Sequence, residues 1–393
     1  MADRTPAPRT PVYVIGGGPG GLAAAAALGE RGVRAVVLER SHAVAGAWRA
    51  HYDGLRLHTT RRMSALPGLP IPRGYGRWVG RDDLARYLEQ YVEHHRLECV
   101  TGVEVARVAR AAADGDVPPN PWVLHASGGR ELTARAVVVA TGYSHTPYLP
   151  DWPGRTEYAG ELLHAADYRN ASPYQGKDVL VVGAGNSGAE IATELAEGGA
   201  GRVRLAVRTV PHVVRRSRLG WSAQRSAVLA RRLPVPVADR VSAVRARLCA
   251  PDLAGHGLPR PASVGVAGLY SRARAGAVPV RDTGLVRAVR AGRVEIVAAV
   301  ESFDGDKPVL VDGSRVDAEV VIAATGYRPG LDDLVGHLDV LDARGHPRAH
   351  GARRQAAAPG LYFTGYANPA SGMLRELATE SRRIAQRIAR DLR

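Results

Sequence analysis

The chain has 393 residues, a hydrophobic content of 45% and a formal net charge of +15 at pH 7. This length allows about two or three domains, and the apolar content is sufficient for sizeable cores, which excludes a disordered or fibrous protein. The arginines are spread along the chain, and no basic stripe with interleaved aromatic residues occurs. The charge therefore does not indicate nucleic-acid binding, and we expect no nucleic-acid partner.

The cysteines and the N-terminal residues indicate the cellular compartment to expect. Cys99 and Cys249 are isolated, so they form no CxxC redox pair and no cysteine zinc site. No apolar stretch approaches the roughly eighteen residues that span a bilayer, and the short polar lead before the first apolar run leaves no room for a signal peptide. We expect a reduced, cytoplasmic protein with no membrane partner and no metal site.

The first predicted unit opens with an apolar strand that turns into an alanine-rich helix. After the run VYVI, the spacing G-x-G-x-x-G is completed by Gly16, Gly18 and Gly21. The first glycine allows a tight turn, the second lets the backbone approach a pyrophosphate, and the third lets helix and strand pack closely. Since the phosphates would lie at the helix N-terminus, the pattern predicts a dinucleotide site that includes Pro19 and Gly20.

The second predicted strand, at residues 35–39, ends on an acidic residue. Glu39 lies about twenty residues beyond the first glycine, where an acid accepts hydrogen bonds from a ribose 2′-hydroxyl. Arg40 follows directly. An unphosphorylated ribose is thus expected in this half, as in FAD.

A second glycine-rich turn of the same kind follows the run DVLVV. Its glycines are Gly183, Gly185 and Gly188, with Asn186 and Ser187 between them. Two such turns imply two dinucleotides.

The strand after the second turn, predicted at 203–207, ends at Arg208 instead of an acid. A guanidinium can hold a 2′-phosphate by charge-assisted hydrogen bonds, whereas a carboxylate would repel it. This residue predicts NADPH in preference to NADH. In a chain so rich in arginine, a merely solvated Arg208 is the alternative.

The turn ATGY also occurs twice, each time at the end of a predicted strand. Ala140, Thr141 and Gly142 belong to the first copy, and Thr325 and Gly326 to the second. A further strand-like run and a final helix follow the second copy, so the second unit is expected to be inserted in the first. The predicted fold is α/β, with two Rossmann-like three-layer domains.

The expected domain limits follow from these repeats. An FAD-binding domain covers residues 1–171 and 327–393, and an NADPH-binding domain covers 172–326, with a partly helical segment near 215–282. In the final stretch GLYFTGYANPASGMLREL, backbone amides near Gly365 and a helix N-terminus near Gly372 can face one ligand. Those dipoles would stabilise the negative charge of a reduced flavin, which places the flavin ring there.

Between the two glycine turns lies a spaced pattern of aromatic residues and a histidine. Tyr158, Gly160, His164 and Tyr168 follow F-x-G-x-x-x-H-x-x-x-Y/F, with Tyr in place of the first Phe. The runs GAW at 46–48, YDGLRLH at 52–58 and GNSGAE at 185–190 accompany it. Together these motifs resemble the class B flavin monooxygenases, most closely the plant YUCCA-type branch.

This resemblance implies an FAD- and NADPH-dependent monooxygenase that oxygenates a small organic substrate with dioxygen through a flavin C4a-(hydro)peroxide. A nucleophilic nitrogen or sulfur, a ketone and a 2-oxo acid remain open as substrates, and the YUCCA-like features favour the last. A flavin reductase that passes electrons to a partner is the alternative enzyme, and a flavin-binding sensor without turnover is the alternative outside enzymes. The helical segment is expected to cover the active cleft or to form a homodimer surface.

The resemblance also assigns residues. His58 is the one candidate catalytic residue, in contact with the flavin ring or its peroxide, with a structural histidine as the alternative. For His164 a conformational role at the domain junction is favoured over a catalytic one. The residues expected to contact the two cofactors are Gly16, Gly18, Pro19, Gly20, Gly21, Glu39, Arg40, Gly46, Trp48, His58, Thr59, Met63, Val105, Ala140, Thr141, Gly142, Gly365, Gly183, Gly185, Asn186, Ser187, Gly188, Arg208, Thr325 and Gly326.

Overall fold

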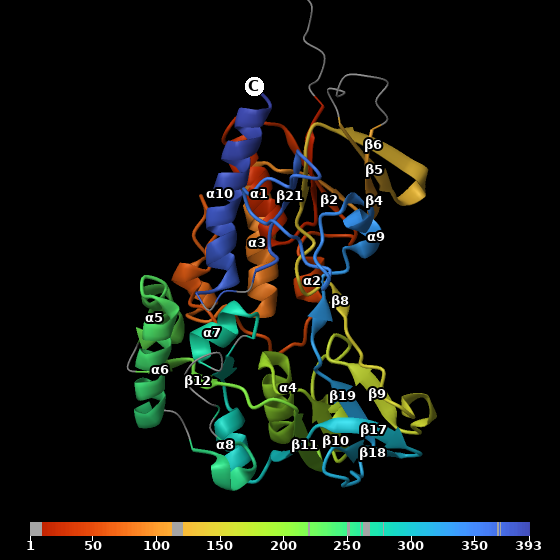
Figure 1. Cartoon of the computed structure of the whole chain (residues 1–393), viewed down its shortest axis with the longest axis vertical. Helices are drawn as coiled ribbons and strands as arrows, with labels where there is room; N and C mark the ends of the chain where they lie inside the picture. The colour runs from red at the N-terminus through yellow and green to blue at the C-terminus, as the bar shows by residue number, and fades with distance from the viewer. Residues whose placement is uncertain are drawn as a thin grey trace, which may run out of the picture.

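The computed structural model describes residues 10–111, 121–218, 221–249, 252–259, 261, 268–277, 279–367, 369 and 371–393. Within these residues the chain forms two five-stranded parallel sheets. They lie at opposite ends of the long axis, and a short ribbon of chain connects them (Figure 1). The side chains of Leu248 and Cys249 and the residues Asn368 and Ala370 fall outside the description.

The first sheet has the strand order β21-β7-β1-β2-β3, with every pairing parallel. Its strands are β1 (Val12–Ile15), β2 (Ala35–Glu39), β3 (Glu98–Thr101), β7 (Val137–Val139) and β21 (Leu361–Phe363). One face is covered by α1 (Pro19–Gly29), α3 (Arg81–His95) and α10 (Met373–Asp391). These three helices run side by side along the upper half of the molecule (Figure 1).

The other face of this sheet packs against a second, antiparallel sheet. That sheet consists of β4 (Val105–Arg110), β5 (Trp122–Ala126) and β6 (Arg130–Ala134), and the short helix α9 (Asp332–Val335) joins it. Successive strand residues alternate between the layers: Val138 packs with the helices, and Val137 and Val139 pack with the antiparallel sheet. The first unit therefore has three layers.

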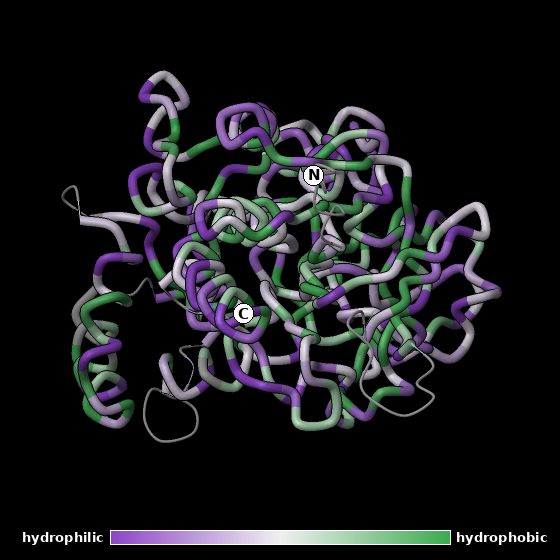
Figure 2. The backbone as a smooth tube through the Cα atoms, turned by 90° about the horizontal axis from the view of Figure 1, so that it is seen from above, coloured by the Kyte–Doolittle hydropathy of each residue, from purple (hydrophilic) through white to green (hydrophobic). Residues whose placement is uncertain are grey.

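The second sheet, β16-β11-β10-β19-β9, repeats this plan. Its strands are β9 (Glu161–His164), β10 (Asp178–Val182), β11 (Arg202–Val207), β16 (Glu295–Ala298) and β19 (Val320–Ala323). Helices α4 (Asn186–Glu197) and α8 (Leu285–Arg290) pack on one face, and the hairpin of β17 (Val300–Asp304) and β18 (Lys307–Leu310) packs on the other. Seen from above, many of the inner stretches of the backbone are hydrophobic (Figure 2).

In the sequence, the second sheet is inserted between two strands of the first sheet. Strands β7 and β21 are neighbours in the first sheet, yet all strands of the second sheet lie between them in sequence. The expected boundary after residue 171 differs from the strand pairing, because β9 pairs in parallel with β19 and so belongs to the second sheet. Strand β9 is short and half-exposed, so it lacks the continuous apolar run that marked the other strands.

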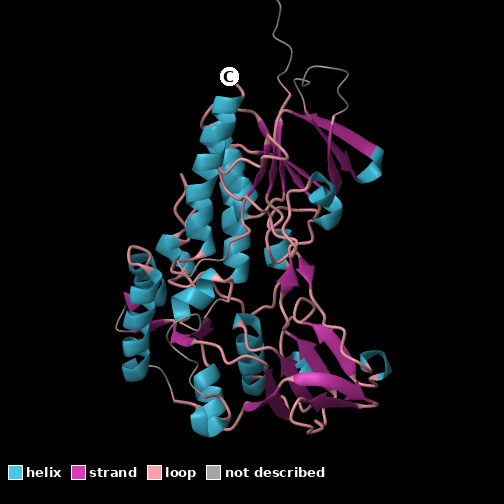
Figure 3. Ribbon diagram, viewed as in Figure 1, coloured by secondary structure: helices cyan, strands magenta, loops and turns pink. Residues whose placement is uncertain are grey.

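Two smaller features complete the fold: a ribbon between the two units and a helical insertion in the second unit. The chain crosses between the units at β8 (Thr146–Pro147) and at β20 (Tyr327–Arg328), and these two segments pair as an antiparallel ribbon. Between the parallel partners β12 (Val213–Arg215) and β15 (Val280–Asp282), the chain forms the turn of β13 (Ser217–Arg218) and β14 (Trp221–Ser222) and then three helices. These helices, the helical insertion, are α5 (Ala223–Ala230), α6 (Val235–Cys249) and α7 (Leu269–Arg274) (Figure 3).

The remaining helical turns are short. They are α2 (Gly46–Arg49) and the 3-10 turns Arg61–Met63, Arg73–Tyr75, Ser127–Gly129, Arg155–Glu157, Ser172–Tyr174, Ala254–His256 and Gly336–Leu338. Among the described helices, none combines the length and the apolar character that crossing a membrane requires.

Candidate active site

The two glycine-rich turns have the same backbone geometry. Gly16 has a φ of +111° and Gly183 a φ of +110°, a region that side chains rarely adopt. A Cβ on Gly16 would lie 2.7 Å from the carbonyl oxygen of Ala140, and a Cβ on Gly183 would lie 2.6 Å from that of Ala324. Each turn therefore presses against the end of the neighbouring strand and accepts only glycine.

The third glycines of the two motifs also match. A Cβ on Gly21 would stand 1.9 Å from the carbonyl oxygen of Gly16, and a Cβ on Gly188 would stand 1.9 Å from that of Gly183. No side chain fits at such a distance. These two glycines let α1 and α4 start directly against their own strands.

The middle glycines differ from the others because they face open space. Gly18 and Gly185 are the N-caps of α1 and α4, and a Cβ on either would meet nothing within 4 Å. The first N–H groups of a helix have no intrahelical partner and attract anions. Both turns thus form an open cradle of the shape and polarity that a pyrophosphate requires, which is the fit expected for two dinucleotides.

The strands next to the two turns end in opposite charges. Glu39 is 8% exposed, and its carboxylate accepts the N–H of Gly17 at 2.6 Å and the N–H of Ser41 at 2.9 Å. Each carboxylate oxygen retains a second lone pair for a ligand hydroxyl. Arg208 directly follows β11 and is exposed, as is Arg40 after β2.

Several predicted flavin contacts converge at the carboxyl end of the first sheet, where ligands bind in such folds. The Tyr143 N–H donates to the carbonyl of Gly365 at 3.3 Å, and a Cβ on Gly365 would lie 4.0 Å from Cα of Gly142. The Thr141 and Tyr366 hydroxyls share a hydrogen bond of 2.7 Å. The end of β7 and the end of β21 are thereby joined in front of the first glycine turn.

The other predicted contacts surround this edge at different distances. Gly46 begins α2 beside Glu39, since a Cβ on it would lie 3.7 Å from Glu39 Oε1, and Trp48 is half-buried two residues further on in the same helix. Thr59 bonds the hydroxyl of Ser64 at 2.7 Å within the loop that also carries Met63. Val105 opens β4 in the antiparallel sheet, so it lies in a different layer from the glycine turn.

In the second unit, the predicted contacts connect to neighbouring segments. Asn186 accepts the N–H of Arg281 at 2.7 Å, which fixes β15 beside the start of α4, and Ser187 follows in the first turn of that helix. The Thr325 hydroxyl donates to the carbonyl of Tyr148. The second ATGY turn is thus tied to the ribbon between the units.

His164 ends β9 and contacts the same turn. The Ala166 N–H donates to His164 Nδ1 at 3.0 Å, so the proton is on Nε2, which donates to the carbonyl of Gly326 at 3.0 Å. Burial lowers the pKa of the imidazole, consistent with this neutral tautomer. Both ring nitrogens are therefore in use, and His164 ties the end of β9 to the second ATGY turn.

The rest of the spaced motif is structural. Tyr158 packs against Phe303 with ring centroids 5.0 Å apart and donates to the carbonyl of Ala318. A Cβ on Gly160 would lie 2.3 Å from the Tyr158 hydroxyl, so only glycine leaves room for that ring. Tyr168 is fully buried and stacks on Tyr174 with centroids 5.7 Å apart. The motif thus fastens β9 to the second sheet.

His58 lies at the junction between the units, facing α4. Its Nδ1 is 3.5 Å from Glu190 Oε1, too far for a hydrogen bond, and is buried without a hydrogen-bond partner among the described residues. The Tyr52 hydroxyl donates to the other oxygen of Glu190 at 2.5 Å. Two first-unit side chains therefore meet one carboxyl group of the second unit.

The charge states at this junction follow from burial. Burial, reinforced by the positive charges of Arg216 and Arg281, lowers the pKa of His58 to about 3 and keeps it neutral. Burial raises the pKa of Glu190 to about 7, and it also raises the pKa of Tyr52. A neutral imidazole whose buried Nδ1 has no partner is suited to meet a ligand at this place.

Sequence reasoning did not assign Glu190 or Tyr52 to the site. Glu190 and Tyr52 stand in the runs GNSGAE and YDGLRLH, but their pairing depends on how the units dock. No group of acidic, histidine or cysteine side chains that could hold a metal occurs among the described residues.

Comparison with protein families identifies the class. Residues 13–221 match the family model described as pyridine nucleotide-disulphide oxidoreductase, which spans both glycine turns. The chain is also 35% identical over 356 residues to indole-3-pyruvate monooxygenase YUCCA1 of Oryza sativa subsp. japonica, covering 90% of this chain and 86% of that protein. It is 33% identical over 361 residues to probable indole-3-pyruvate monooxygenase YUCCA9 of Arabidopsis thaliana, covering 90% and 83%.

Solved structures agree with this class. A flavin-containing monooxygenase from Stenotrophomonas maltophilia superposes with a TM-score of 0.73 at 26% identity, covering 97% of this chain and 98% of that one. An open structure of cyclohexanone monooxygenase shares the fold, with a TM-score of 0.70 at 18% identity over 97% of this chain and 87% of that one. The chain therefore belongs to the class B flavin monooxygenases and is YUCCA-like. It is a flavin-dependent monooxygenase.

Proposed function

We propose that the chain binds FAD in the first glycine turn and NADPH in the second, and oxygenates a small organic substrate with dioxygen. The observation that carries this proposal is the matched pair of open cradles at Gly18 and Gly185, which belong to two sheets of the same plan. On this proposal the domain division is an FAD unit interrupted by an NADPH unit, with β9 in the latter.

In the FAD unit, the residues of the chain bind and orient the cofactor. The helix N-terminus of α1 holds the pyrophosphate, and Glu39 accepts from the adenosine ribose. Gly142 and Gly365, which meet at the carboxyl end of the sheet, let the backbone approach the flavin ring. Neutral His58 contacts the ring or its reactive face without bringing a charge, because its pKa is too low for a general acid at neutral pH.

In the NADPH unit, the N-terminus of α4 holds the pyrophosphate and Arg208 holds the 2′-phosphate. When bound, NADPH and FAD supply hydride transfer and the activation of dioxygen. The protein contributes a site that excludes water, so that one oxygen atom reaches the substrate and the other leaves as water.

The substrate class we favour is a 2-oxo acid. The YUCCA relatives are named as indole-3-pyruvate monooxygenases, and the chain aligns with them over 90% of its length. Oxygenation of such an acid at its carbonyl would be accompanied by loss of carbon dioxide. Amines, sulfides and ketones are the competing substrate classes.

The test is an aerobic reaction of the purified protein with NADPH and ¹⁸O-labelled dioxygen across these four substrate classes. One labelled oxygen atom in a product, at one product per NADPH consumed, is the expected result. NADPH oxidation without labelled product from any class, with electrons passed instead to an added acceptor protein, would establish the reductase alternative. Bound flavin that NADPH does not bleach would establish the sensor alternative.

A further inference from the structure

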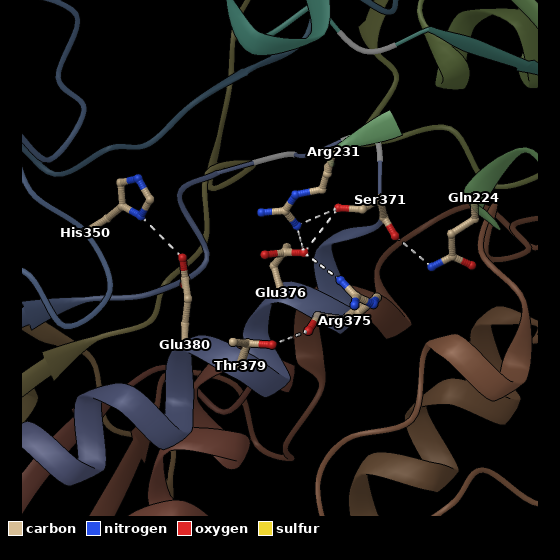
Figure 4. Close-up of polar contacts among 8 residues, drawn as sticks. All are labelled: Gln224, Arg231, His350, Ser371, Arg375, Glu376, Thr379 and Glu380. Carbon is tan, nitrogen blue, oxygen red and sulfur yellow. Dashed lines mark hydrogen bonds and ion pairs between the residues drawn. The ribbon is translucent and has the colours of Figure 1, made fainter. Parts of the chain in front are cut away.

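Gln224 is a buried side chain of the helical insertion that reaches into the first unit. It is 1% exposed and lies in the first turn of α5. Its Oε1 accepts the N–H of Thr60 at 3.0 Å. Its Nε2 donates to the carbonyl of Ser371 at 2.8 Å (Figure 4). One carboxamide therefore joins two segments that are far apart in the sequence.

Both segments belong to the proposed flavin site. Thr60 follows His58 and Thr59, and Ser371 precedes Gly372, the N-cap of α10. Gly372 has a φ of +101°, and a Cβ on it would lie 2.6 Å from Thr59 Cγ2 and 2.7 Å from Gln224 Nε2. The loop of Thr59, the turn at Gly372 and the carboxamide of Gln224 are therefore packed so closely that a methyl group on Gly372 would not fit.

A second attachment lies at the end of α5, where Arg231 is the C-cap residue. Arg231 forms an ion pair with Glu376 and donates to the Ser371 hydroxyl at 3.2 Å, and Arg375 donates to Glu376 at 3.2 Å (Figure 4). Glu376 stands in the first turn of α10, where a negative charge is favourable. The Arg231 side chain is 51% exposed, so this ion pair is open to solvent, whereas the contacts of Gln224 are not.

We propose that Gln224 is a positioning residue of the flavin site. By holding Thr60 and Ser371 at a fixed separation, it fixes the loop of His58 against the N-terminus of α10 and keeps water from between them. Removing the carboxamide would leave a buried donor and a buried acceptor unpaired, which favours entry of water or separation of the segments. The inference rests on the proposed function, because that function places the flavin beside these segments.

The first experiment needs no cofactor. In the flavin-free protein, hydrogen–deuterium exchange at the Thr60 amide is compared between the wild type, Gln224→Leu and the matched control Leu229→Ala. Leu229 lies on the same helix and is 51% exposed. We expect exchange to be faster by about 10-fold in Gln224→Leu, the change that accompanies loss of one buried hydrogen bond, and unchanged in the control. Equal protection in all three proteins would overturn the proposal.

The second experiment measures how the contacts of Gln224 affect the flavin. Gln224→Leu is expected to retain FAD and a wild-type KM for NADPH, but to release several-fold more hydrogen peroxide per NADPH and to shift the visible flavin spectrum toward that of free FAD. Arg231→Ala removes the exposed ion pair with Glu376 and the hydrogen bond to the Ser371 hydroxyl but leaves both contacts of Gln224, so it should change these values less. A folded Gln224→Leu with wild-type peroxide yield and spectrum would show Gln224 to be merely structural.

A conservative variant changes the hydrogen bonding of residue 224 without changing the size of its side chain. In Gln224→Glu the ionised carboxylate still accepts from Thr60 but cannot donate to Ser371, whereas the protonated carboxyl group can do both. Peroxide release by this variant should therefore fall as the pH is lowered from 8 to 6, while the wild type and Gln224→Leu show no such difference. The charged neighbours Arg231 and Glu376 are common to all three proteins. A flat profile for Gln224→Glu would contradict the proposal even if Gln224→Leu does not fold.

These outcomes are distinguishable from failure of the proposed function. A wild-type protein that holds no flavin would refute the proposed function, and with it the positioning role. A wild-type protein that holds flavin and yields labelled product, beside a Gln224→Leu variant with the same coupling, would refute only the role of Gln224.

Discussion

The two glycine-rich turns are nearly superimposable in local geometry and differ in the strand beside them. Both open on a glycine with φ near +110°, both close on a glycine that faces a carbonyl oxygen, and both leave the middle glycine in open space. Strand β2, however, ends on the buried Glu39, whereas β11 is followed by the exposed Arg208. On the proposed function, the backbone sets where a dinucleotide lies, and the residue at the end of the neighbouring strand sets which dinucleotide it is.

The largest expected effect comes from the closing glycines. Gly21→Ala places a methyl group 1.9 Å from the carbonyl oxygen of Gly16, so α1 cannot pack on β1 and the first unit should not fold. Gly18→Ala is the matched control, because its methyl group meets open space. Thermal unfolding followed by circular dichroism checks this pair. A Gly21→Ala protein that melts within a few degrees of Gly18→Ala would contradict the geometry.

A larger side chain at Gly18 or at Gly185 should weaken the binding of one cofactor and not of the other. Gly18→Val fills the first cradle and should abolish FAD binding, while Gly185→Val should keep FAD and weaken NADPH by about 10-fold to 100-fold, the value of one or two charge-assisted hydrogen bonds. Flavin absorbance per protein and NADPH titration measure the two effects. If Gly185→Val lost FAD and Gly18→Val retained it, the assignment of the cofactors to the two halves would be reversed.

The residue that follows β11 should control the preference for NADPH over NADH. Arg208→Ala removes the proposed partner of the 2′-phosphate and should raise the KM for NADPH by about 10-fold, with a change of less than about 2-fold for NADH. Arg202 at the opposite end of β11 pairs with Glu295 at the surface, so Arg202→Ala serves as the control. Equal losses for NADPH and NADH would mean that Arg208 does not read the phosphate.

The smallest effect concerns the junction between the two units. Burial raises the pKa of Glu190 from 4.5 to about 7, so the unfolded chain ionises first as the pH rises, and stability falls between about pH 4.5 and 7. Glu190→Gln keeps a polar partner for Tyr52 but does not ionise. Its unfolding free energy relative to the wild type should rise by about 1–3 kcal/mol from pH 5 to pH 8.

Urea unfolding at several pH values measures this difference. His58, whose pKa is lowered, contributes the opposite slope, but it is present in both proteins and cancels in the comparison. Glu30→Gln, a change at an exposed carboxylate, should show no such trend. The same trend in both variants would place the pH dependence elsewhere in the chain.

The features that the sequence predicted well are local. The glycine turns depend on a few neighbouring residues, and the repeated ATGY turn indicated that the strands of one sheet are inserted in the sequence of the other. The roles assigned to Glu39, the last residue of β2, and to Arg208 after β11 stay predictions. The junction contacts could not be predicted in this way. Tyr52 meets Glu190 across 138 positions, and Gln224 meets Thr60 across 164, so these pairs exist only once the units have docked.

The antiparallel ribbon of β8 and β20 has a mechanical consequence. The two strands join the units side by side, with Tyr327 opposite Pro147 and Arg328 opposite Thr146. The hydrogen bonds of this pair run across the two strands, so sliding one strand along the other would break them. The two crossings therefore act as one paired connection and not as two independent linkers. A rotation of one unit about either single crossing would first have to break this pairing.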